Sequence, residues 1–178
     1  KSAPEEFVAN LKLYEYLTGD TEYVSLIDGN YGGRWGVKIG EKTLLLTDPY
    51  KGINAFNVAN YLNSLTVKKN VYLDFGSGIG SDAIKVSKMV ERPTRFLLCD
   101  IPLNLTTAYA YVSANVNYKC RLVSSKKQLH KILQSNFSEH EFIFIPSMFV
   151  EEVAKQLVSI DLMYNHGSFS EMDYDTIN

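Results

Sequence analysis

Apolar residues along the chain follow two spacings, one typical of buried strands and the other of amphipathic helices. Short apolar runs, bounded by polar residues, Gly or Pro, occupy residues 71–75, 94–100, 120–123, 142–145 and 160–164. The segments between these runs have helical spacing, most clearly in the stripe formed by Leu105, Ala108, Tyr109, Val112 and Val116. Strands that alternate with helices favour an α/β fold, with a Rossmann-like parallel sheet and helices on both of its faces.

The first third of the chain has a different pattern. Residues 5–17 and 53–65 each predict a helix, and residues 35–47 predict a hairpin between them. We therefore expect an N-terminal helix and hairpin extension over residues 1–66, followed by a nucleotide-binding domain over residues 67–178.

A glycine-rich turn ends the first strand of the predicted sheet. Asp74, Gly76, Gly78 and Gly80 form the pattern D-x-G-x-G-x-G, and helical spacing begins at Ser81. Glycines permit a sharp turn, and the free N–H groups of a helix start can face a ligand. The dinucleotide fingerprint G-x-G-x-x-G would need glycine where Ser81 stands.

This pattern, with its preceding acid, resembles motif I of the S-adenosylmethionine-dependent methyltransferases. The resemblance implies that Asp74, Gly76, Gly78 and Gly80 bind S-adenosylmethionine as cofactor. The alternative interpretation is a purely structural turn between a strand and a helix.

Polar residues also follow the later strands. Asp100 comes twenty residues after Gly80, the spacing at which a carboxylate reaches ribose hydroxyls, although Asp-Ile-Pro is also typical of a helix start. Ser124 and Ser125 follow the third strand, where we expect contact with adenine. Asn165 follows the last strand and could hold the methionine moiety, hold the substrate or stabilise the turn. Ligands of parallel sheets lie beyond the carboxyl ends of the strands, so one shared site is predicted.

Two longer segments point to a narrower resemblance. D-I-P-L-N-L-T-T-A-Y-A-Y, from residue 100, and D-L-M-Y-N-H-G-S-F-S-E-M, from residue 161, resemble segments of the sugar O-methyltransferase family. The resemblance implies O-methylation of a sugar or of another small hydroxylated substrate.

Methyl transfer to a sugar hydroxyl gains from a nearby base. His166 is the first candidate because imidazole titrates near neutral pH, and the alternative is a loop histidine bonded to the backbone. Glu171 could bind a sugar hydroxyl, orient His166 or cap a helix. No cluster has convincing metal-ligand spacing, so we predict transfer without a metal ion, with a Mg²⁺ site around Glu171 and Asp173 as the alternative.

Sheets of this methyltransferase superfamily usually have seven strands, whereas this chain stops at Asn178, directly after the motif of the fourth strand. We therefore expect a fold truncated after the fourth core strand, or a sheet that a second copy or another chain completes. A non-catalytic nucleotide-binding or assembly module is one alternative function. An NAD-dependent oxidoreductase is another, and Ser81 and Asp74 disfavour it.

Composition narrows the class of protein further. With 178 residues, 46% of them hydrophobic, the chain can bury one main core. Its net charge of −2, without a basic run, predicts no nucleic-acid partner, and a methyltransferase that binds tRNA through a local patch is the alternative. No apolar run approaches the roughly 20 residues of a membrane span, and no signal-like segment opens the chain, so we expect a cytoplasmic protein. Cys99 and Cys120 lack zinc-ligand spacing and predict reduced core thiols.

Overall fold

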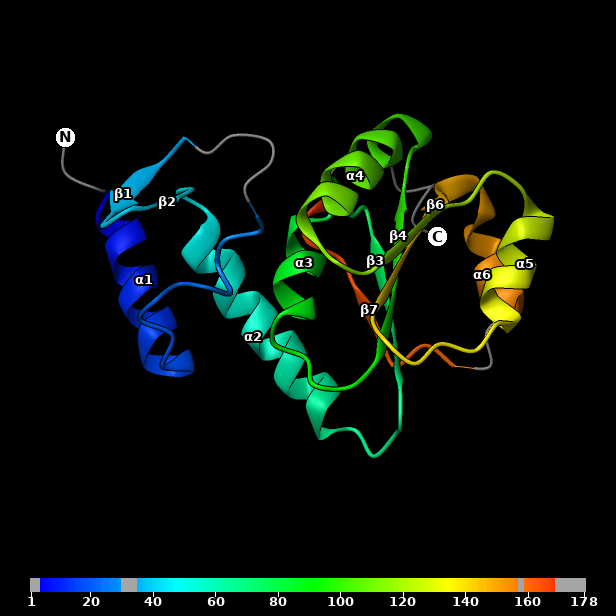
Figure 1. Ribbon diagram of the computed structural model, residues 1–178, viewed down its shortest axis with the longest axis horizontal. Helices are drawn as coiled ribbons and strands as arrows, with labels where there is room; N and C mark the ends of the chain where they lie inside the picture. The colour runs from blue at the N-terminus through cyan, green and yellow to red at the C-terminus, as the bar shows by residue number, and fades with distance from the viewer. Residues whose placement is uncertain (1–3, 30–34, 157–158, 169–178) are drawn as a thin grey trace.

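The computed structural model describes residues 4–29, 35–156 and 159–168, and within these ranges it contains one five-stranded parallel sheet (Figure 1). Its strand order is β5-β6-β4-β3-β7. The strands are β3 (Asn70–Phe75), β4 (Thr94–Asp100), β5 (Lys119–Leu122), β6 (Glu141–Pro146) and β7 (Leu162–Tyr164). The predicted α/β class and parallel sheet are confirmed. These five strands coincide with the five apolar runs of the sequence, and truncation after the fourth core strand stays a prediction.

Helices cover both faces of the sheet (Figure 1). One face packs against α2 (Asp48–Ser64), α3 (Ser81–Ser87) and α4 (Pro102–Asn115). The other face packs against α5 (Lys126–Gln134) and α6 (Val150–Gln156). The short 3-10 helix η1 (Ser147–Phe149) directly precedes α6. The side chains of β4 alternate accordingly. Phe96 and Leu98 belong to the first core, whereas Leu97 and Cys99 belong to the second. Successive side chains of a strand point to opposite faces of the sheet, so each strand contributes to the core on both faces.

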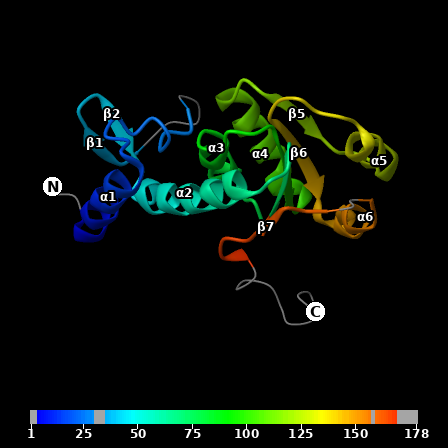
Figure 2. The same cartoon turned by 90° about the horizontal axis from the view of Figure 1, so that it is seen from below.

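The N-terminal extension lies beside α2, at the end of the molecule away from α5 and α6 (Figure 2). It consists of α1 (Glu5–Thr18) and the antiparallel hairpin of β1 (Val37–Ile39) and β2 (Lys42–Leu44). Its own small core contains Phe7, Tyr14, Leu26 and Leu44. The predicted helix and hairpin are thus present.

Helix α2 connects the extension to the sheet. Its residues Ala55, Ala59 and Leu62 are buried in the same core as the strands, although the predicted division after residue 66 assigns the helix to the extension. The helix begins at Asp48 rather than at residue 53. Pro49 stands in its first turn, where a missing N–H group costs no hydrogen bond, so this proline starts the helix instead of only ending the hairpin.

Two further sequence-based expectations can be compared with the described residues. Cys99 is buried, Cys120 is partly buried, and both are free thiols. Among the helices described, none has the length and apolar character needed to cross a membrane.

Candidate functional site

The turn between β3 and α3 has a backbone that only glycine adopts without strain. Gly76, Gly78 and Gly80 have φ angles of +76°, +55° and +79°. The Gly76 N–H donates to the carbonyl oxygen of Cys99 at 2.7 Å, and the Gly80 N–H donates to that of Ser77 at 2.9 Å. The turn is therefore closed on itself and fastened to the end of β4.

The three glycines have different surroundings. A Cβ atom at Gly76 would overlap the side chain of Ser168, and one at Gly80 would lie 2.7 Å from Val112 of α4. A Cβ at Gly78 would meet no atom within 4 Å. Gly76 and Gly80 are thus needed for packing, whereas Gly78 presents its backbone on the open side of the turn.

Asp100, at the end of β4, holds this turn in place. Its Oδ2 accepts a hydrogen bond from the Gly78 N–H at 2.7 Å, and its Oδ1 accepts from the Ile101 N–H at 2.7 Å and from Asn104 Nδ2 at 2.9 Å. One carboxylate therefore joins the glycine turn to the first residues of α4. A helix begins at Pro102, as the Asp-Ile-Pro sequence predicts, but its N-cap residue is Ile101 and no side chain caps it. The contact of Asp100 with ribose stays a prediction.

Asp74 is the penultimate residue of β3, and only 2% of its surface is exposed. Burial, and then the nearby carboxylate of Asp82, raises the pKa of Asp74 to about 8; Lys51 opposes this shift, and Asp100 adds to it. Asp74 is therefore mostly protonated at neutral pH. A cation bound at this turn would favour its ionised form.

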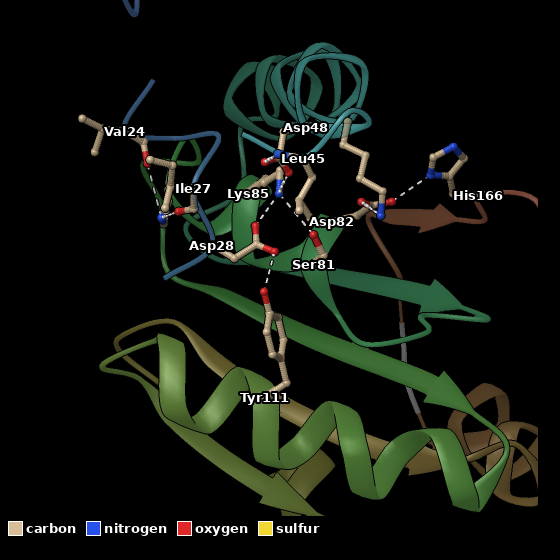
Figure 3. Close-up of polar contacts among 12 residues, drawn as sticks. Val24, Ile27, Asp28, Leu45, Asp48, Ser81, Asp82, Lys85, Tyr111 and His166 are labelled. Atoms are coloured by element: carbon tan, nitrogen blue, oxygen red, sulfur yellow. Dashed lines mark hydrogen bonds and ion pairs between the residues drawn. The ribbon is translucent and has the colours of Figure 1, made fainter. Parts of the chain in front are cut away.

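His166 faces the glycine turn from the segment after β7. Its Nδ1 lies 2.8 Å from Oδ2 of Asp82 (Figure 3). Oδ1 of Asp82 forms an ion pair with Nζ of Lys51 at 3.0 Å. Together with the turn, these side chains line a pocket of about 150 Å³, whose walls are Lys51, Asp74, Gly76, Ser77, Gly78, Ile79, Ser81, Asp82 and His166. The structure thus brings His166 together with Asp74 and two of the predicted glycines.

Asn165 fastens the end of β7 to the end of β3. Its Nδ2 donates to the carbonyl oxygen of Phe75 at 2.6 Å and also to Oγ of Ser168. Ser168 Oγ donates to the same Phe75 carbonyl at 3.0 Å. These contacts support the interpretation that Asn165 stabilises the turn, among the three left open by the sequence. Glu171 and Asp173 lie outside the described residues.

Ser124 and Ser125 are not brought to the glycine turn. They follow the edge strand β5, which lies three strands from β3, or about 14 Å at the usual strand spacing. Ser125 caps α5 by accepting a hydrogen bond from the Gln128 N–H, and Ser124 donates to the side chain of Gln128. The strand beside β4 is β6, and Pro146 pairs with Asp100. Ser147 and Met148, which follow Pro146, therefore lie nearer the predicted nucleoside position.

A buried network behind the turn has no clear sequence signal. Lys85 of α3 has no exposed surface, and its Nζ forms ion pairs with Asp28 and, at 3.2 Å, with Asp48 (Figure 3). It also donates to Ser81 Oγ at 3.1 Å, and Tyr111 of α4 donates to Asp28 at 3.0 Å. The network links the N-terminal extension to α3 and α4, and it reaches the pocket through Ser81, which lines the pocket wall.

Two general properties of the site concern metal ions and apolar surface. Within residues 4–29, 35–156 and 159–168, no group of three or more His, Cys, Asp and Glu side chains could hold a metal ion. Apolar side chains at the carboxyl ends of β3, β4 and β6 are about half exposed or more, namely Ile79, Ile101, Leu103 and Met148.

These features define an α/β protein with a Rossmann-like sheet, whose glycine turn, strand-end carboxylates and histidine converge at one edge. Comparisons with protein-family models, curated proteins and solved structures found no match.

Proposed function

We propose that this protein is an S-adenosylmethionine-dependent methyltransferase, acting on a hydroxyl group of a sugar or of another small molecule. The observation that carries the proposal is the acidic character of the glycine turn. Asp74, Asp82 and Asp100 surround it, and their mutual repulsion helps to keep Asp74 protonated. A pyrophosphate would add negative charge to this region. The sulfonium of S-adenosylmethionine would add positive charge, which the carboxylates of Asp82 and Asp100 attract and which favours ionisation of Asp74.

The lining residues suit the parts of this cofactor. The open face of Gly78 allows close approach of a ligand to the backbone, and the exposed side chains of Ile79, Ile101 and Met148 offer apolar surface for an adenine ring. Lys51, on the pocket wall, can attract a carboxylate. When bound, S-adenosylmethionine supplies a methyl group activated by its positively charged sulfur. The protein supplies alignment and a proton acceptor.

His166 is the proton acceptor that the proposal requires. It lines the same pocket as Asp74 and Gly78, and 32% of its side chain is exposed, so a substrate hydroxyl can reach it. Imidazole is suited to this role near neutral pH. Glu171 remains a further candidate for binding the substrate or assisting His166.

A second candidate is a module that binds a nucleotide without transferring a methyl group. The pocket lined by the described residues is about 150 Å³, below the roughly 300 Å³ at the lower end of small-molecule sites, and so leaves little room for an acceptor beside a nucleotide. An NAD-dependent oxidoreductase is disfavoured by the carboxylates and by Ser81, whose buried Oγ is engaged with Lys85.

Calorimetric titration with S-adenosylhomocysteine and with NAD⁺, on the wild type and on two matched variants, tests the proposal. Gly78 and Gly40 have φ angles of +55° and +58°, and a Cβ atom at either position meets open space. Gly78→Leu and Gly40→Leu therefore carry similar backbone strain, on the order of 1–2 kcal/mol. We expect Gly78→Leu to weaken binding of S-adenosylhomocysteine at least tenfold and Gly40→Leu to leave it unchanged. Binding of NAD⁺ alone, or equal effects of both substitutions, would contradict the proposal.

Methyl transfer to a panel of sugars and other small hydroxylated acceptors then separates the two candidates. Transfer that depends on His166 supports the methyltransferase. Tight binding of S-adenosylhomocysteine without transfer to any acceptor, with His166 intact, supports the binding module.

A further inference from the structure

The histidine of the candidate site has a carboxylate partner that lies 84 residues earlier in the sequence. His166 Nδ1 lies 2.8 Å from Asp82 Oδ2, and only 13% of the Asp82 side chain is exposed. Asp82 occupies the first turn of α3, directly after the glycine turn. The pair therefore connects the segment after β7 to the element that would face a nucleotide.

The surrounding side chains restrict both members of this pair. Lys51 of α2 holds the other oxygen of Asp82 at 3.0 Å. The rings of Tyr50 and Tyr164 lie against the imidazole of His166, with centroids 5.5 and 6.2 Å away. The imidazole is thus positioned by rings from α2 and β7, and the carboxylate is positioned by an ammonium group.

This arrangement determines which imidazole nitrogen can accept a proton. An ionised carboxylate only accepts hydrogen bonds, so the Nδ1 atom of His166 must donate to Asp82. In a neutral imidazole the lone pair is then on Nε2. The other nitrogen is therefore left as the basic one.

We propose that Asp82 is a positioning residue, which holds neutral His166 in the Nδ1–H tautomer and so makes Nε2 the base for the substrate hydroxyl. This inference rests on the proposed methyltransferase function. As the hydroxyl oxygen bonds to the methyl carbon, the carbon–sulfur bond breaks and its electron pair stays on sulfur. The hydroxyl proton goes to Nε2 of His166, which afterwards releases it to water. Asp82 keeps its hydrogen bond to Nδ1 throughout.

The contacts of Asp82 also indicate how an amide at position 82 would change the tautomer of His166. Nζ of Lys51 can only donate, so in Asp82→Asn the amide oxygen should face Lys51 and the amide NH₂ should face His166. The Nδ1 atom would then have to accept a hydrogen bond, and the proton of the neutral ring would move to Nε2. The substitution therefore reverses the tautomer with little change in shape.

Nitrogen-15 NMR of the imidazole rings measures the tautomer directly, without any ligand. His140 provides an internal reference, because its Nδ1 accepts from the Thr94 N–H at 3.1 Å, which requires the Nε2–H form when the ring is neutral. We expect His166 in the Nδ1–H form in the wild type and in the Nε2–H form in Asp82→Asn. In the double variant Lys51→Met with Asp82→Asn, the amide is free to turn, and we expect part of the Nδ1–H signal to return.

A second histidine–carboxylate pair supplies a matched control. His130 Nε2 lies 3.3 Å from Glu152 on the surface, away from the pocket. Glu152→Gln should leave the His166 signals unchanged, which separates a contact effect from a general effect of losing one carboxylate. An Nε2–H tautomer of His166 in the wild type, or an unchanged tautomer in Asp82→Asn, would overturn the proposal.

Kinetics and calorimetry separate this inference from the proposed function. Asp82→Asn should lower kcat by about 100-fold, a typical contribution of general base catalysis, with a smaller change in the KM for S-adenosylmethionine. Equal changes in kcat and KM would contradict a role in proton transfer. Failure of the wild type to bind S-adenosylhomocysteine would refute the methyltransferase function, whereas the tautomer measurement tests the His166–Asp82 pair independently of it.

Discussion

Replacement of Asp74 by Asn should change how the free energy of unfolding depends on pH. The pKa of Asp74 is about 8 in the folded protein, against the ordinary value of 3.8 that represents the unfolded chain. Between these values the unfolded chain releases the proton that the folded protein retains, so stability decreases as pH rises. The contribution of Asp74 is fully present below pH 3.8 and is lost as pH rises towards 8.

The size of the effect follows from the shift. Each pH unit in this interval costs about 1.4 kcal/mol, so between about pH 5.5 and 7.5 the wild type should lose about 2.5 kcal/mol through Asp74. Only 2% of Asp74 is exposed, so solvent does little to reduce this value. The amide in the Asp74→Asn variant has no such proton, and the stability of this variant relative to the wild type should rise by the same amount.

Urea unfolding followed by circular dichroism, at several pH values from 5.5 to 7.5, measures this difference. Glu5→Gln, at an exposed position of α1, controls for the loss of one acidic side chain. A difference between Asp74→Asn and the wild type that stays constant within about 0.5 kcal/mol over this range would refute the raised pKa of Asp74. Asp74 would then not be an acid that burial and its neighbours keep protonated.

Two further variants test the packing around the site. Lys85→Met should destabilise the fold by about 3–5 kcal/mol, because it leaves the buried carboxylates of Asp28 and Asp48 without their cation. A loss of stability below about 1 kcal/mol in urea unfolding would contradict the buried network. Gly80→Ala should lower the free energy of unfolding by about 1–3 kcal/mol more than Gly78→Ala, because only the Cβ at position 80 meets Val112, and adding Val112→Ala should recover part of that difference. Equal losses of stability in the two alanine variants would contradict this packing.

The strand, glycine turn and helix could be predicted from sequence because each depends on neighbouring residues. The glycines at positions 76, 78 and 80 are required by positive φ angles within one turn. Asp100 could be predicted as a site residue because it is the last residue of its own strand. The same local patterns predicted α1, the hairpin and the alternation of strands and helices.

The order of the strands could not be predicted from local patterns. For this reason the adenine contact was predicted at Ser124 and Ser125, which follow the edge strand β5. Strand order depends on packing between distant segments, and β6 rather than β5 lies beside β4. One signal was present in the sequence. Lys119 and Arg121 give β5 a polar character, whereas residues 142–145 are entirely apolar and buried, as expected of an interior strand.

The side-chain partners of the site were also beyond the reach of local patterns. Asp82 meets His166 from 84 residues away, and Asp28 meets Lys85 from 57 residues away. Asp28 follows Leu26-Ile27 at the start of a loop and Asp82 lies at the start of a helix, and an exposed acid would be equally common at either position. Only the packing of α2 and α3 against the sheet brings these charges together.

The proposed function requires that the acidic glycine turn bind a cationic sulfonium nucleoside. Calorimetric titration of S-adenosylmethionine at pH 7, repeated in two buffers of different ionisation enthalpy, tests it most directly, with NAD⁺ titrated in parallel. We predict that S-adenosylmethionine binds, that binding releases a proton as Asp74 ionises, and that Asp74→Asn abolishes this release. Tighter binding of NAD⁺ than of S-adenosylmethionine, or binding of S-adenosylmethionine without proton release from the wild type, would contradict a cation site beside Asp74.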